Sequence, residues 1–201
     1  MDINSFDTGD ILLFEGYKEL SIFYLLDYLI EYFTNSKYCH TGMVVKNPKI
    51  DNKILKGLYL LESTGGTGIK DVTDNKTHFG VQLVPLKERL DKTKEPCYYR
   101  KLNCKRTPEF LKLFEDAYYI VRDKPYDVHP DDWIKSDFYI KLGNVQKTNT
   151  FFCSALVSYL LTKLEIIPND TDWTLMRPTD LGTEKGSRLY IPQLNKEIQI
   201  K

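Results

Sequence analysis

One cysteine of this chain has a setting that favours nucleophilic chemistry. Cys153 stands near the start of the segment 151–164, FFCSALVSYLLTKL, whose apolar side chains recur at helical spacing. A thiol at the start of a helix lies beside unpaired backbone N–H groups and the positive end of the helix dipole, which favour the thiolate. The same N–H groups can stabilise an oxyanion on an acyl group under attack. Because cysteine is also often buried, this position alone fits packing as well as catalysis.

His40 is the candidate general base. It begins the predicted strand 40–45, HTGMVV, whose alternation places His40, Gly42 and Val44 on one face. A histidine at the first position of a strand lies near the end of the sheet, where a partner from another element can reach it. On its own, such a histidine fits a structural role equally.

Glu62 is the candidate residue that orients His40. It lies in the predicted strand 58–64, LYLLEST, whose apolar character makes an unpaired carboxylate costly. If this strand forms an antiparallel hairpin with 40–45 that closes near Lys46 and Leu58, Glu62 lies opposite residue 42 and diagonal to His40. A slip of one residue in the pairing would turn Glu62 to the other face.

The elements that must position these residues form one α+β domain over 1–201, because no repeat, low-complexity segment or linker divides the chain. Further strands are predicted over 10–14, 81–86, 97–102 and 189–191, and further helices over 19–33 and 107–121. The apolar stripe of 19–33 is expected to pack on the core, since its acidic polar face would be repelled by anionic lipids. The connection 123–150 is long and contains Trp133 and Phe138, which suggests a lid or a substrate wall.

The motifs follow one another in the order TGDILLF, TNSKYCHTGMVV, LLESTG, VQLVPL, KPYD, FFCSALV and RPTDL. This order, from Gly9 to Leu181, resembles the circularly permuted branch of the papain-like, NlpC-type cysteine hydrolases, which has bacterial and poxvirus members. The resemblance implies an antiparallel sheet or half-barrel packed against the helix that carries the cysteine. It also implies that Cys153 is the nucleophile, His40 its general base and later acid, and Glu62 the residue that orients His40.

The resulting hypothesis is a cysteine hydrolase without a cofactor, which cleaves a peptide or isopeptide amide through an acyl-enzyme. Two alternatives stay open. One is a lipid-directed thioesterase or acyltransferase, because a related permuted branch acts on lipid-like acyl substrates. The other is a papain-like module without turnover that serves in a virion or in contact with a host protein. Tyr38, Asp10 and Tyr126 are candidates to line the cleft or assist the oxyanion.

The composition and the remaining motifs argue against several other classes of function. Lys and Arg number 28 and Asp and Glu 28, so no nucleic-acid partner is expected. No apolar run has the length of a membrane span, and MDINSFDTGD has no features of a secretory signal, so a cytoplasmic or other intracellular protein is expected, with a virion location compatible. The four cysteines are then expected as free thiols. His78 and His129 lack metal-ligand spacing, Ser154 and Ser158 lack a G-x-S-x-G elbow, and no phosphate-binding glycine motif is present.

Overall fold

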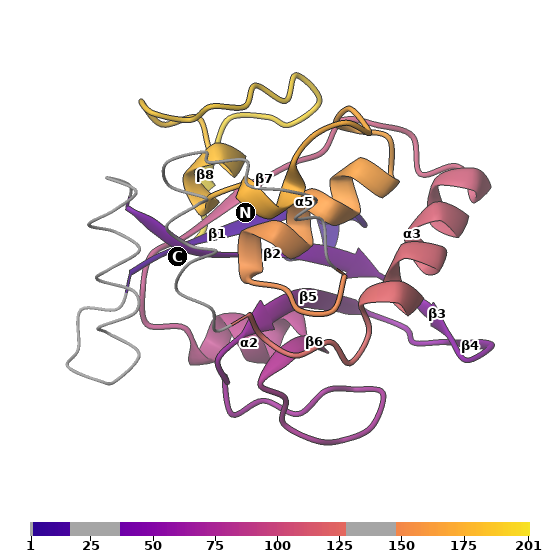
Figure 1. Cartoon of the computed structure of the whole chain (residues 1–201). Coiled ribbons are helices and arrows are strands. Elements are labelled where there is room, and N and C mark those ends of the chain that lie inside the picture. The colour runs from indigo at the N-terminus through magenta and orange to yellow at the C-terminus, as the bar shows by residue number, and fades with distance from the viewer. Residues whose placement is uncertain (1, 17–36, 128–147) are drawn as a thin grey trace.

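The computed structural model describes residues 2–16, 37–127 and 148–201. The predicted helix 19–33 and most of the connection 123–150 lie outside these ranges. Six described strands form one antiparallel sheet in the order β6-β5-β2-β1-β7-β8 (Figure 1). Their bounds are β1 Ile11–Glu15, β2 Tyr38–Lys46, β5 Leu58–Thr64, β6 Gly80–Pro85, β7 Cys97–Arg100 and β8 Ile198–Gln199. The described part of the chain is therefore α+β with an antiparallel sheet, as the sequence predicts.

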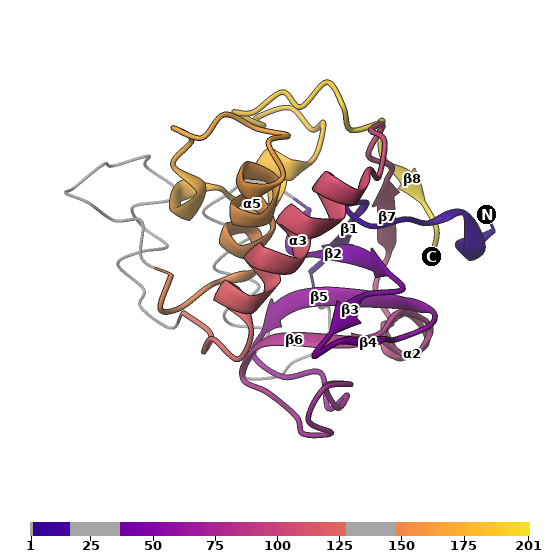
Figure 2. The same ribbon diagram turned by 90° about the vertical axis from the view of Figure 1, so that its right-hand side faces the viewer.

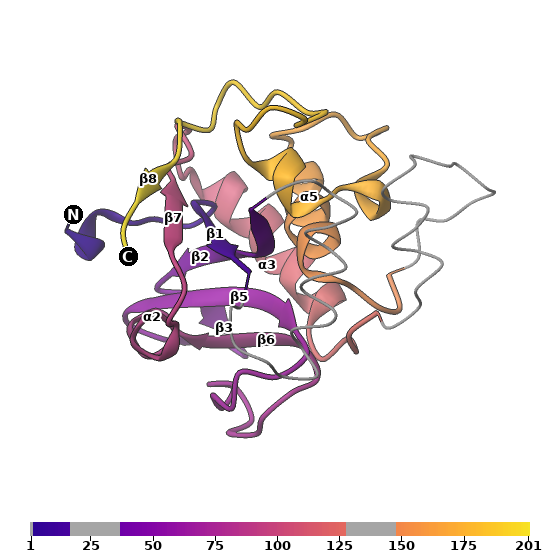
Figure 3. The ribbon, with the colours of Figure 1, turned by 90° about the vertical axis from the view of Figure 1, so that its left-hand side faces the viewer.

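Both faces of this sheet are buried. One face, which includes Met43 and Leu61, packs in one hydrophobic cluster with the helices α3 (Pro108–Val121) and α5 (Cys153–Lys163). The other face, which includes Val44 and Leu60, packs in a second cluster with the start of the short helix α2 (Leu86–Lys92). Figure 2 shows α3 and α5 together on one side of the sheet, and Figure 3 shows β7 running across the direction of β5 and β6, as in a strongly twisted sheet.

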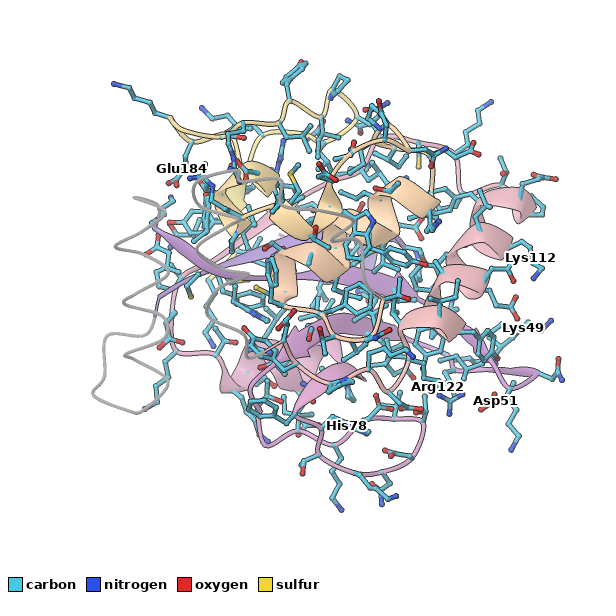
Figure 4. All side chains as sticks on the ribbon, in the orientation of Figure 1. Lys49, Asp51, His78, Lys112, Arg122 and Glu184 are labelled. Atoms are coloured by element: carbon cyan, nitrogen blue, oxygen red, sulfur yellow. The ribbon has the colours of Figure 1, made fainter. Side chains whose placement is uncertain are left out.

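The helix α3 begins where the sequence predicts. The side chain of Thr107 accepts a hydrogen bond from the backbone N–H of Phe110, and Pro108 takes the first helical position. The C-terminal end of α3 contacts the small hairpin of β3 (Lys49–Ile50) and β4 (Lys53–Ile54). There Arg122 forms an ion pair with Asp51 at 3.0 Å (Figure 4).

The register of β2 and β5 agrees with the prediction. Lys46 pairs with Leu58 and Gly42 with Glu62, so Glu62 is diagonal to His40. The pairing of β1 with β2 has an irregularity that the sequence does not reveal. Phe14 pairs with His40 and Glu15 with Tyr38, so Cys39 is an extra residue in a β-bulge.

Several parts of the chain differ from the prediction. The predicted strand 189–191 is wrong: Tyr190 is 84% exposed and unpaired in the sheet, and the sixth strand, β8, forms later. The helix α2 was not expected. Three short 3₁₀ helices are also present, η1 Ile3–Ser5, η2 Trp173–Leu175 and η3 Pro178–Leu181. No helix among the described ranges has the length and apolarity needed to cross a bilayer.

Gly80, the first residue of β6, is required because the segment that follows α3 passes close to its backbone. It has a φ of 148°, and a Cβ at this position would collide with the carbonyl oxygen of Lys124 and lie 2.8 Å from Pro125 Cα. We therefore expect Gly80→Ala to lower the free energy of unfolding by roughly 3 kcal/mol, from backbone strain and displacement of this segment. Urea unfolding measures the loss.

Gly66→Ala is the matched control. Gly66 also has a positive φ, 119°, but nothing lies within 4 Å of the added Cβ. This variant has the backbone strain of a positive φ but no collision, so we expect the free energy of unfolding to fall by only about 1 kcal/mol. Equal losses in the two variants would contradict the importance of the close approach at Gly80.

Candidate active site

The imidazole of His40 and the carboxylate of Glu62 form a close pair on adjacent strands. His40 Nε2 lies 2.7 Å from Glu62 Oε2. The side chain of Glu62 is fully buried, whereas that of His40 is 16% exposed. The pair thus has a buried acidic end and an imidazole that solvent can reach.

Cys153 reaches the same imidazole from the other side. It is the first residue of α5, and its thiol lies close enough to the imidazole of His40 to raise the pKa of that ring. Because Nε2 of His40 already contacts Glu62, Nδ1 is the ring nitrogen left for the thiol. Cys153 Sγ also lies 3.8 Å from the carbonyl oxygen of Cys39. A thiol, an imidazole and a carboxylate from three distant parts of the sequence are therefore consecutive partners.

The bulge at Cys39 contributes to this convergence. On either side of the bulge, Tyr38 belongs to the hydrophobic cluster of α5, while His40 lies beside Phe14, a member of the opposite cluster. The carbonyl of the bulged Cys39 faces the thiol of Cys153. Bulges commonly re-aim side chains beside functional sites. The side chain of Cys39 is buried, with its Sγ 3.7 Å from the carbonyl oxygen of Phe14.

The start of α5 is fixed to β5 and to two neighbouring segments by backbone and hydroxyl contacts. Ser63, on β5, donates a hydrogen bond of 2.6 Å to the carbonyl oxygen of Phe151. Tyr126 and Phe151 form a parallel backbone bridge. Within α5, Ser154 donates a 2.6 Å hydrogen bond to the carbonyl oxygen of Met176. These contacts set the position of Cys153 relative to β2 and β5.

Two side chains that the sequence analysis did not single out complete the surroundings of Glu62. Arg89, on α2, places Nε 3.0 Å from Oε1 and 3.1 Å from Oε2 of the carboxylate. Gln82, on β6, donates from Nε2 to Oε1 at 2.9 Å. Gln82 is a polar residue in the apolar strand VQLVPL, so the reasoning that identified Glu62 applies to it too. Arg89 carries no comparable signal, because α2 is short and mostly charged.

These contacts shift the pKa values of the pair in opposite directions. Burial alone would lower the pKa of His40, but hydrogen bonds to Cys153 and Glu62 and their negative charge raise it to about 9. Burial alone would raise the pKa of Glu62, but Arg89, His40 and Gln82 lower it to about 2. At neutral pH the pair is therefore an imidazolium and a carboxylate.

Tyr38 and Tyr126, two of the three candidate cleft residues, lie in different surroundings. Tyr38 precedes the bulge and is fully buried, with its ring edge-on to Tyr98 and under the ammonium of Lys37. Burial raises the pKa of Tyr38. Tyr126 is partly buried one residue before the described limit at 127, and its ring packs against Phe79.

The structure does not bring Asp10, the third candidate cleft residue, together with Cys153, His40 and Glu62. Asp10 precedes β1, whereas Phe14, near the other end of this strand, is the residue opposite His40. Its carboxylate instead accepts hydrogen bonds from Tyr99 Oη at 2.6 Å and from Arg106 Nη2 at 2.9 Å. Asp10 is thus the centre of a separate buried network.

The other candidates for chemistry remain apart from this site. His78 pairs with Asp74 at 3.1 Å in the loop between β5 and β6 (Figure 4). Ser158 is buried within α5. His129 lies outside the described residues. In the part of the chain that the structure describes, no three His, Cys, Asp or Glu side chains form a group that could hold a metal ion. All four cysteines are free thiols, as predicted.

Fold and site together define an α+β protein with an antiparallel sheet and a Cys–His–Glu arrangement between sheet and helix. Among solved structures, the chain is similar to the crystal structure of the metalloprotein yiiX from Escherichia coli O157:H7. The two are 15% identical, the match covers 96% of each chain, and the TM-score is 0.53. At this identity the likeness shows the fold alone. The chain matches no protein-family model, and no curated protein matches its sequence.

Proposed function

We propose that this protein is a cysteine-dependent hydrolase that cleaves an amide bond, in a peptide or an isopeptide, through an acyl-enzyme. The observation that carries the proposal is the contact of Cys153 with a His40 imidazole that is itself paired with the buried Glu62. An imidazolium beside a thiol favours the reactive thiolate, and a carboxylate behind the imidazole holds it in place. The order of the elements, with the His and Glu strands before the Cys helix, supports a permuted papain-like fold.

The reaction follows from these positions. The thiolate of Cys153 attacks the carbonyl carbon, and a carbon–sulfur bond forms while the oxygen takes the negative charge. The N–H groups of the first turn of α5 have no acceptor within the helix, so they are the donors available to this oxyanion. His40 then gives its Nδ1 proton to the leaving nitrogen as the carbon–nitrogen bond breaks.

The second half of the reaction regenerates the enzyme. Water gives a proton to the now neutral His40 and adds its oxygen to the thioester carbon. The carbon–sulfur bond breaks, the acid leaves, and Cys153 returns to a thiolate beside an imidazolium. Glu62 stays ionised throughout, because its pKa of about 2 lies far below that of the imidazole.

Thiol alkylation tests the nucleophile. Iodoacetamide is added to the folded protein near neutral pH, and the labelled cysteines are mapped by mass spectrometry. On exposure alone Cys104 should react first, since it is half-buried whereas the other three cysteines are buried. We expect Cys153 to react first instead, and His40→Ala to slow its labelling by on the order of tenfold or more. Labelling that follows exposure, with Cys104 ahead of Cys153, would contradict an activated thiol.

Acyl probes test the reaction itself. Peptidyl, isopeptide and lipid-like acyl probes are compared in wild type and Cys153→Ala. We expect a covalent adduct on Cys153 with peptide-like probes and none in the variant. Preference for the lipid-like probes would change the substrate class to the thioesterase or acyltransferase alternative. A folded wild type that reacts with no acyl probe would favour a module without turnover.

A further inference from the structure

We propose that Arg89 is a positioning residue of this site. Its guanidinium holds the carboxylate of Glu62 and the ring of Phe14, and through these two it fixes the imidazole of His40. The inference rests on the proposed function, because it assigns a role within the same Cys–His–Glu site.

Two routes of contact lead from Arg89 to His40. The first passes through Glu62, whose two oxygens both lie near Nε of Arg89 and whose Oε2 also contacts His40. The second passes through Phe14. The guanidinium carbon of Arg89 lies 4.6 Å from the centroid of the Phe14 ring, and that ring centroid lies 5.4 Å from the imidazole. The imidazole is therefore contacted on its Nε2 edge and beside its ring by two groups that Arg89 holds.

Arg89 is itself held in place. Its Nη1 donates to Oγ1 of Thr93, and that hydroxyl donates to the carbonyl oxygen of Arg89 at 2.9 Å. The side chain is 13% exposed, so little of the charge is screened by solvent. A planar guanidinium can meet a carboxylate at its edge and an aromatic ring at its face, whereas a lysine ammonium cannot do both.

The cation also sets the electrostatics of the site. The titratable groups around this cation and the His40 imidazole come from the strands β2, β5 and β7, the helix α5 and the C-terminus: His40, Glu62, Cys97, Cys153 and Lys201. Loss of a positive charge makes every neighbouring acid harder to deprotonate, so the pKa values of Glu62 and His40 should both rise. If Arg89 had only a structural role, its loss would lower the amount of folded protein without raising the pKa values of both Glu62 and His40.

The test is the pH profile of Cys153 alkylation by iodoacetamide in wild type and Arg89→Met. The rate is measured on folded protein from acid to alkaline pH. In the variant we expect the alkaline limb, where His40 loses its proton, to move up by about one pH unit, which is tenfold in proton concentration. A folded Arg89→Met with the wild-type profile would overturn the proposal.

Arg106→Met is the matched control. Arg106 forms an ion pair with Asp10 at 2.9 Å. The side chain of Arg106 is 13% exposed and that of Asp10 is 0% exposed, the same values as for Arg89 and Glu62. Its guanidinium also lies over a phenylalanine ring, Phe110, at 5.8 Å. This variant should lose stability, yet keep the wild-type pH profile. A shift equal to that of Arg89→Met would show a general effect of losing a buried cation.

Arg89→Lys keeps the proposal testable if Arg89→Met does not fold. It retains the charge, so its alkaline limb should stay near the wild-type pH. The plateau rate should fall several-fold, since the contact with both Glu62 and Phe14 is lost. A wild-type plateau would overturn the positioning role. The failure of this proposal is distinguishable from the failure of the proposed function. If peptide-like acyl probes leave Cys153 unlabelled while the alkylation profile shifts, the proposed function fails and the role of Arg89 stands. If the probes label Cys153 while the profile does not shift, the role of Arg89 fails and the proposed function stands.

Discussion

Replacing Glu62 with Gln is expected to lower the free energy of unfolding at pH 7 by about 3–5 kcal/mol, the typical cost of breaking a buried ion pair. The change leaves the partly buried guanidinium of Arg89 without its counterion and removes the charge that supports the His40 imidazolium. Urea unfolding measures the stability, and iodoacetamide measures Cys153 on the folded protein. We expect alkylation to slow together with the loss of stability.

The pH dependence of stability should change in the same variant. The pKa of Glu62 is lowered from its ordinary 4.5 to about 2 in the folded protein. Its contribution is therefore complete above pH 4.5 and is lost as the pH falls toward 2, an amount of roughly 3 kcal/mol. Glu62→Gln should lack this part of the acid slope.

The double variant Glu62→Gln/Arg89→Met separates folding from chemistry. It removes both charges, so it should recover most of the stability, because no unpaired ion stays buried. Alkylation of Cys153 should remain slow, because the carboxylate behind His40 is still missing. A single variant that loses less than about 1 kcal/mol, or a double variant as unstable as the single one, would contradict the account of this pair.

Asp10→Ala is expected to destabilise the protein by a similar 3–5 kcal/mol without slowing the chemistry. The carboxylate of Asp10 is fully buried and accepts hydrogen bonds from the backbone N–H groups of Asp7 and Leu102, from Tyr99 and from Arg106. Its removal leaves these donors without their acceptor and leaves the guanidinium of Arg106 without its counterion. Urea unfolding measures the cost.

The rate of Cys153 alkylation in folded Asp10→Ala is the second half of that test. It should equal the wild-type rate, because Asp10 and the site lie at opposite ends of β1. Asp10→Asn keeps the shape of the side chain and provides a milder variant if Asp10→Ala does not fold. A slower alkylation in either folded variant would place Asp10 in the working site after all.

The sequence was most informative where a single residue breaks a regular pattern. Glu62 stands out in an apolar strand, and a hairpin closed at Lys46 and Leu58 fixes its place opposite Gly42. Thr107 and Pro108 likewise mark the start of α3 because capping is a local interaction. In these cases short-range chemistry and strand alternation are enough to determine the position.

The remaining parts of the site depend on contacts that no local pattern encodes. Arg89 lies on a helix of seven residues whose first turn has no side-chain cap, so tertiary packing decides whether it forms. The bulge at Cys39 appears only when β1 and β2 are paired. The predicted strand 189–191 has a suitable composition, but β7 pairs instead with Ile198 and Gln199, and Tyr190 faces solvent.

The ionisation of His40 in solution shows whether the sulfur, the imidazole and the carboxylate act as one electrostatic unit. Nuclear magnetic resonance can follow the imidazole of His40 through a pH titration in wild type and in Cys153→Ala. Since the chain has three histidines, His40→Asn assigns the signal. We expect a midpoint near 9 in wild type and a clearly lower one in Cys153→Ala, because the thiol is one of the groups that raise it. A midpoint near 6.5 that is the same in both proteins would contradict the account.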